Sequence, residues 1–160
     1  MSAYDDPRAH ALRDRYHAVF GGDELPVPVE SIAEDLLALR VEVRRDLDVS
    51  GMLLPLERKI YVRADEPEPR RRFTIAHELG HLVCQCLEGS ARPVYCRAEE
   101  IGVDAAGKAL EREANIFAAN LLMPEPAVRA AAGENRFGVS EEALAWRLYN
   151  LGLATERPGS

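Results

Sequence analysis

The stretch that organises this chain reads Thr74-Ile75-Ala76-His77-Glu78-Leu79-Gly80-His81. Two residues four positions apart on a helix lie one turn above each other on the same face. His77 and His81 can therefore point two imidazole nitrogens at one Zn²⁺. Glu78 is rotated by about 100° from His77, so it lies beside the metal without ligating it. A carboxylate in that place can act as a general base toward an attacking water, as in metallopeptidases.

Apolar residues around the motif follow a helical period, and the polar residues lie mostly off their stripe. The stripe consists of Ile75, Ala76, Leu79, Leu82 and Val83. The alternative interpretation is an amphipathic helix with two solvated histidines, because a five-residue pattern also occurs by chance. The chain has only 4 histidines, and two of them stand here at ligand spacing in an apolar helix. This placement favours a zinc site, which then needs a third protein ligand.

The third ligand is expected on a helix in the second half of the chain. Glu111 and Asn115 lie four residues apart and so share a helix face. A Glu111 carboxylate would complete a site of two histidines and one glutamate. Asn115 could then accept a hydrogen bond from the outer N–H of a ligating histidine. Glu113 is the second candidate, about 200° away round the helix; we prefer Glu111 because its face is otherwise small and apolar. The two remaining histidines, His10 and His17, stand far upstream in the chain and are not preferred as ligands.

Length and composition suit one domain with a hydrophobic core, since the chain has 160 residues of which 47% are hydrophobic. We expect a single metallopeptidase domain over residues 1–155 and a disordered tail over residues 156–160. A net charge of −7 argues against direct binding to nucleic acid, whose phosphates attract Lys and Arg. Neither a signal peptide nor a run of the roughly 20 apolar residues of a membrane span is visible. The expected location is therefore the cytoplasm, without membrane contact.

Three cysteines, Cys84, Cys86 and Cys96, are expected to be reduced thiols. Cys84 and Cys86 are spaced as C-x-C, which is not the C-x-x-C spacing typical of zinc sites. We therefore expect zinc to be bound without them, while their own role stays open.

Periodicity along the chain predicts an α+β fold. A small sheet of about three antiparallel strands would pack on a mainly helical bundle that carries the His77–His81 helix. Helices are expected over residues 7–20, 29–37, 108–123, 128–132 and 140–151. Strands are expected over residues 41–44, 51–54 and 59–62, the last two as a hairpin. Residues 88–107 are expected to form a long loop, and such loops are often functional lids.

A second distinctive block follows the His77–His81 motif and reads Glu111-Arg112-Glu113-Ala114-Asn115-Ile116-Phe117-Ala118-Ala119-Asn120-Leu121-Leu122-Met123-Pro124. The terminal segment holds Phe137-Gly138-Val139-Ser140 and then Trp146-Arg147-Leu148-Tyr149-Asn150-Leu151-Gly152-Leu153. With the His77–His81 motif, these blocks resemble the ImmA/IrrE family of metallopeptidases, over about residues 32–153. The resemblance implies a small zincin-like, more narrowly gluzincin-like, endopeptidase that binds Zn²⁺ through His77, His81 and Glu111 and uses Glu78 in catalysis.

Proteins similar to this family often work beside a helix-turn-helix transcriptional repressor and relieve repression by cutting it. The expected partner is therefore a protein substrate, a repressor of this kind or an antitoxin-like protein. An extended substrate would pair with an edge of the 51–62 hairpin. The alternative function is a zinc-containing regulatory binding protein that sequesters such a partner without cleaving it. Glu78 favours the enzyme, because binding alone needs no carboxylate beside the metal. The residue that stabilises the oxyanion stays open among Tyr61, Tyr95 and Tyr149.

Overall fold

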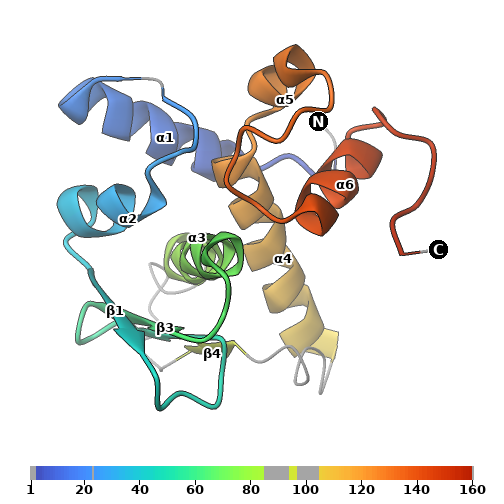
Figure 1. Cartoon of the computed structure of the whole chain (residues 1–160). Helices are drawn as coiled ribbons and strands as arrows, with labels where there is room; N and C mark the ends of the chain where they lie inside the picture. The colour runs from blue at the N-terminus through green and yellow to red at the C-terminus, as the bar shows by residue number, and fades with distance from the viewer. Residues whose placement is uncertain (1–2, 23, 85–93, 97–104, 160) are drawn as a thin grey trace.

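The computed structural model of the chain describes residues 3–22, 24–84, 94–96 and 105–159. Figure 1 shows the arrangement of its helices and strands. In order along the chain they are α1 (Pro7–Phe20), α2 (Val29–Ser31), the π-helix η1 (Ile32–Leu36), β1 (Arg40–Arg44), β2 (Gly51–Leu54), β3 (Lys59–Arg63), α3 (Glu68–Cys84), β4 (Val94–Cys96), α4 (Ala105–Leu122), α5 (Glu125–Ala131) and α6 (Glu141–Asn150). The α+β class is confirmed.

The helices begin and end where local chemistry predicts. The Asp6 carboxylate accepts the Arg8 backbone N–H at 3.0 Å and caps α1, which ends at Gly21 with φ +75°. Ser140 caps α6 in the same way by accepting the Ala143 N–H at 3.1 Å. The segment after Pro124 differs from expectation, because α5 already begins at Glu125. Pro126 does not prevent this, since a proline in the first turn removes no intrahelical hydrogen bond.

The sheet has four strands in the order β1-β3-β2-β4 and is mixed, where three antiparallel strands were expected. The predicted β2–β3 hairpin is antiparallel, with Leu53 opposite Ile60. β1, however, pairs in parallel with β3. After β1 the chain passes to β2, which runs in the opposite direction and is not the neighbour of β1. The β2–β3 hairpin then places β3 between β1 and β2. The alternation of apolar residues specifies the faces of a strand but not its neighbour, so sequence could not settle this order.

The expectation that substrate pairs with a free edge of the 51–62 hairpin is wrong for this topology. β3 lies between β1 and β2, and the other edge of β2 pairs with β4, with Met52 opposite Tyr95. β4 falls within the long loop predicted over residues 88–107. Apart from β4 and the start of α4 at Ala105, that predicted loop lies outside the described residues.

α3 lies at the centre of the fold, with the sheet on one side and the other helices around it (Figure 1). Every residue from Thr74 to Leu82 is buried. The sequence pattern predicted an apolar stripe on one side only. The polar side of α3 is buried as well, because α4 packs against it while the apolar stripe faces the core.

In the described ranges no helix combines the length and apolarity that crossing a membrane would take. A single domain over residues 1–155 and a disordered tail over residues 156–160 stay predictions.

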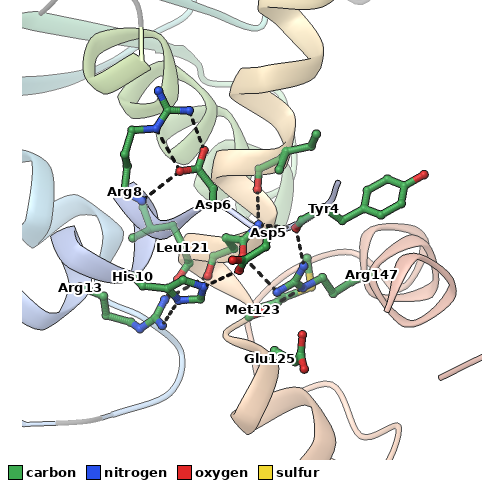
Figure 2. A network of polar contacts seen from close by, with 12 residues as sticks. Tyr4, Asp5, Asp6, Arg8, His10, Arg13, Leu121, Met123, Glu125 and Arg147 are labelled. Carbon is green, nitrogen blue, oxygen red and sulfur yellow. Dashed lines mark hydrogen bonds and ion pairs between the residues drawn. The ribbon is translucent and has the colours of Figure 1, made fainter. Parts of the chain in front are cut away.

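A network of polar contacts ties the N-terminal segment to the end of α4 (Figure 2). Asn120 donates from Nδ2 to the Tyr4 carbonyl at 2.8 Å. Arg13 donates to the Asn120 carbonyl at 3.0 Å, and Arg147 donates from Nε to the Met123 carbonyl at 3.0 Å. The last carbonyls of a helix lack partners within the helix, so these guanidinium groups satisfy groups that would otherwise be buried unpaired. Burial lowers the pKa of Arg147, but that group remains a cation.

We expect Arg147→Met to lower the free energy of unfolding by about 2–4 kcal/mol, because buried carbonyls lose their donor. The Arg147 side chain is 3% exposed, and it also lies 3.5 Å from the Tyr4 carbonyl. Urea denaturation followed by circular dichroism measures the loss. Arg136→Met is the matched control, since Arg136 is exposed and, among the described residues, pairs with exposed Glu134; we expect a change within about 0.5 kcal/mol. Equal effects of the two substitutions would contradict the structural role of Arg147.

Candidate metal centre

His77 and His81 point their imidazole rings toward the same place from successive turns of α3. Their Nε2 atoms lie 3.1 Å apart, and the ring planes are inclined at 86°. Both side chains are buried, at 3% and 1% exposure. The four-residue spacing therefore brings two nitrogen donors together inside the protein rather than on its surface.

Glu111 reaches this pair from α4. Its Oε2 lies 2.8 Å from His77 Nε2, and its Oε1 lies 3.1 Å from His81 Nε2. Burial alone would raise the pKa of the Glu111 carboxyl, but hydrogen bonds and charge from the two histidines outweigh burial and lower it to about 2. The side chain therefore stands as a carboxylate between two imidazoles.

Asn115 lies one turn beyond Glu111 and contacts the other side of His77. His77 Nδ1 donates to Asn115 Oδ1 at 2.7 Å. In the tautomer protonated only at Nδ1, the lone pair of Nε2, which lies 2.8 Å from Glu111 Oε2 and 3.1 Å from His81 Nε2, would be open to a metal ion. Asn115 thereby holds His77 in the tautomer and orientation that a metal ligand needs.

The other candidate ligands lie elsewhere. Glu113 points to a different face of α4, where its carboxylate lies 3.7 Å from the Arg8 guanidinium and is 41% exposed. His10, on α1, contacts Asp5 at 3.0 Å. His17 also lies on α1, near the end of that helix. Neither the glutamate nor these histidines approach the cluster of His77, His81 and Glu111.

The Glu111 carboxylate on α4 reaches His77 and His81 because α3 and α4 approach closely at Gly80. A Cβ atom built on Gly80 would lie 3.0 Å from both the Cα and the carbonyl oxygen of Ala114, and 3.2 Å from Phe117 Cβ. Ala114 stands three residues after Glu111, nearly one turn along the same helix. Sequence reasoning missed this contact, although glycine and alanine at these positions are its signal.

We expect Gly80→Leu to destabilise the protein by more than Gly80→Ala. Both replacements gain about 1 kcal/mol of helix propensity and both add the Cβ atom, so the difference between them isolates the steric effect of the side-chain atoms beyond Cβ. Overpacking costs about 1–3 kcal/mol, and the contacted backbone of Ala114 cannot rotate away as a side chain would. Urea denaturation of both metal-free variants measures the difference. If Gly80→Leu were as stable as Gly80→Ala, the helices would not depend on this contact.

Glu78 lies beside the cluster and is fully buried. Within the described residues, neither of its carboxyl oxygens has a hydrogen-bond partner. Burial raises the pKa of Glu78 to about 8, while the charge of His81 lowers it and that of Glu111 raises it. Gly51 of β2 covers this carboxyl: a Cβ there would overlap Thr74 Cγ2 and lie 3.5 Å from Glu78 Oε1. The close packing of β2 on α3 therefore encloses the acid.

The residues present fit a divalent metal. Two imidazole nitrogens and a carboxylate oxygen form a common donor set for Zn²⁺, and their donor atoms all lie within 4.8 Å of one another. Ligands at about 2.0–2.1 Å from a tetrahedral centre lie about 3.3–3.4 Å apart. The contacts of 2.8–3.1 Å would therefore open by only a few tenths of an ångström. The Glu78 carboxyl, which has no hydrogen-bond partner among the described residues, can act as an acid or a base at this place.

A cavity of about 340 Å³ opens onto His77 and gives access to the cluster. Its walls come from α3, α4 and α6, and they include Phe73, Thr74, Asn115 and Trp146. Tyr61 and Tyr149 are not among the described residues that line this cavity: Tyr61 stacks under Arg44 at 4.9 Å, and Tyr149 contacts Trp146. The side chain of Tyr95 lies outside the described residues.

Cys84 is buried at the end of α3 as a free thiol. Burial raises its pKa to about 12, although the nearby Arg8 lowers it. Cys84 does not belong to the cluster of His77, His81 and Glu111, and zinc binding without the cysteines stays a prediction. The side chains of Cys86 and Cys96 lie outside the described residues.

Comparison with known proteins identifies the family of this chain and finds solved structures that resemble it. The sequence model of peptidase family M78, described as an IrrE N-terminal-like domain, matches residues 35–149. No curated protein sequence matches the chain significantly. A solved Mycobacterium tuberculosis transcriptional regulator matches with a TM-score of 0.67 and 21% identity, over 98% of this chain and 49% of that one. The chain thus spans about half the length of that regulator, and at this identity the likeness shows a shared fold.

Proposed function

Because this chain belongs to peptidase family M78, we propose that it is a zinc-dependent endopeptidase. One observation carries the proposal. The fully buried Glu78 carboxyl lacks a partner within the described part of the chain and stands next to the cluster of His77, His81 and Glu111. A buried polar group without a partner costs free energy, and a site that only binds a metal gains nothing from such a carboxyl. A metal-dependent hydrolase uses the carboxyl as a general base.

His77, His81 and Glu111 would hold the zinc ion, and Asn115 would keep His77 oriented through the 2.7 Å contact. When bound there, zinc would polarise the scissile carbonyl and lower the pKa of the attacking water. In its ionised form, which the charge of a zinc ion beside it would favour, the Glu78 carboxyl takes a proton from that water as it attacks the carbonyl carbon. The same group later gives the proton to the leaving amine nitrogen.

The substrate we propose is a helix-turn-helix transcriptional repressor, or an antitoxin-like protein, in the cytoplasm. The resemblance to ImmA/IrrE proteins supports this choice, and the structurally similar mycobacterial protein is itself a transcriptional regulator. The cavity at His77 provides a path for the substrate chain to the cluster. The net charge of −7 favours a protein partner over direct contact with DNA.

The test is incubation of the zinc-loaded protein with the helix-turn-helix repressor encoded nearest to its own gene. We expect fragments of the repressor by mass spectrometry, and no fragments after zinc is removed by a chelator. An intact repressor that still binds the zinc-loaded protein tightly would overturn the peptidase and leave the sequestering protein as the function.

A further inference from the structure

A second cavity, of about 410 Å³, continues the one at His77 along α4 and α6. The two cavities share Phe73, Asn115, Ala143 and Trp146 as lining residues. We call the continuous depression the α4–α6 groove. It begins at the metal cluster, because Asn115, which lines both cavities, is hydrogen-bonded to His77. The end of the groove nearest His77 is therefore continuous with the cavity that opens onto the metal cluster.

The walls of the distal cavity are mainly apolar and come from three helices. The apolar lining residues include Phe73, Ile116, Ala119, Met123 and Trp146. The small side chain of Ala119 on α4, and that of Ala143 on α6, leave the space that larger residues would fill. Tyr4 adds a wall from the N-terminal segment, where Asn120 holds its carbonyl at 2.8 Å. A hollow of this volume accepts a large apolar side chain together with adjoining main chain.

The charged groups along the distal cavity have one sign. Lys108 and Arg112 lie one turn apart on α4, line the cavity and are exposed. Neither side chain forms an ion pair with the residues that the structure describes. Arg147 also lines the cavity but is buried and donates to the Met123 carbonyl. No Asp or Glu is among the described lining residues of this cavity. A carboxylate on the occupant would therefore meet two available cations.

We infer that the α4–α6 groove is the specificity subsite of this protein. It takes a peptide with a large apolar side chain beside the scissile bond and an acidic residue within the next two positions. The inference rests on the proposed peptidase function, since it assumes that the occupant is the substrate chain. Its basis is the continuity of an apolar cavity with the metal cluster, together with two cations along that cavity, Lys108 and Arg112, that form no ion pair with the described residues.

Trp146 makes the groove directly observable, because it lines both cavities and is the only tryptophan in the chain. The probes are blocked peptides acetyl-Gly-Gly-X-Gly-Z-Gly-amide, with X as Phe or Gly and Z as Glu or Lys. They are titrated into the zinc-loaded Glu78→Gln protein, so that no peptide is cleaved. Binding is followed by the fluorescence of Trp146.

We expect the peptide with Phe and Glu to change the fluorescence saturably. Replacing Phe by Gly should weaken binding at least about 10-fold, the range for losing a large group from an apolar pocket. Ala119→Leu should fill the groove and remove most of the preference for Phe over Gly. The control Ala130→Leu, on the exposed side of α5, should keep that preference. Equal binding of the Phe and Gly peptides would overturn the inference, and so would an unchanged preference in Ala119→Leu.

The preference for an acidic residue at position Z is tested with a separate variant. Arg112→Glu should reverse the preference for Glu over Lys at position Z and leave the ratio for Phe over Gly unchanged. Arg15→Glu, an exposed change on α1, is the charge-matched control and should alter neither ratio. An unchanged Glu preference in Arg112→Glu would overturn the acidic part of the inference.

Failure of the inference and failure of the proposed function give different results. If the peptides report on Trp146 as expected but the zinc-loaded parent protein cleaves neither them nor the repressor, the peptidase function fails while the groove stands. If the parent protein cleaves the repressor and Ala119→Leu cleaves it equally well at the same bond, the groove assignment fails and the peptidase stands.

Discussion

Glu78→Gln is expected to keep one zinc ion per chain and to lose cleavage of the protein substrate by at least about 100- to 10,000-fold, the range for removing a general base. Zinc should stay because His77, His81 and Glu111 are untouched. The amide of Gln cannot accept a proton from the attacking water, although its size is nearly that of Glu. The helix should also persist, since Gln and Glu have similar helix propensities.

Three measurements on the same sample decide this prediction: zinc content by atomic absorption, repressor binding, and repressor fragments over time. Glu68→Gln is the matched control, because Glu68 is exposed in the first turn of the same helix and should leave cleavage unchanged. If Glu78→Gln relieves repression as well as the parent does, proteolysis is not the mechanism. Sequestration would then explain the biological effect.

Glu111→Ala is expected to weaken zinc binding by more than about 100-fold, beyond the 10–100-fold typical of losing an outer partner of a ligand. The Glu111 carboxylate contacts both histidines, at 2.8 and 3.1 Å, so its removal deletes one of three protein donors. Competition with a chromophoric chelator measures the affinity, and circular dichroism checks that the fold is retained.

Glu113→Ala is the control on the same helix. Its carboxylate faces Arg8 at 3.7 Å and is 41% exposed, and exposed ion pairs are typically worth about 0–1 kcal/mol. We therefore expect a small change in stability and no loss of zinc. The reverse pattern, with zinc lost only in Glu113→Ala, would move the third ligand to Glu113 and contradict the arrangement described above.

Local spacing was enough to predict several features of the candidate site. A helix repeats every 3.6 residues, so the pairing of His77 with His81 and of Glu111 with Asn115 follows from their positions in the chain. The separation of Glu111 from Glu113 around the helix follows in the same way. Helix caps depend on equally local chemistry, because the Asp6 and Ser140 side chains each accept a backbone N–H from two or three residues further along the chain.

Features that depend on contacts between distant segments were less predictable. The alternating pattern at Val41 indicated a strand but not its parallel pairing with β3. The burial of Arg147 had no local signal, because the carbonyls it satisfies belong to Met123 and Tyr4, far away in the chain. The α4–α6 groove likewise depends on how α6 packs beside α4, which no periodicity within either helix specifies.

The sequence by itself determined which polar side chains share a helix face and which chemistry they can perform together, because helix geometry is the same in any protein. Only the tertiary structure decided that the face carrying His77 and His81 meets the face carrying Glu111. That meeting requires two helices to approach until Gly80 touches the backbone of Ala114. Such an approach is set by the close packing of side chains from all parts of the fold, and no single stretch of sequence encodes it.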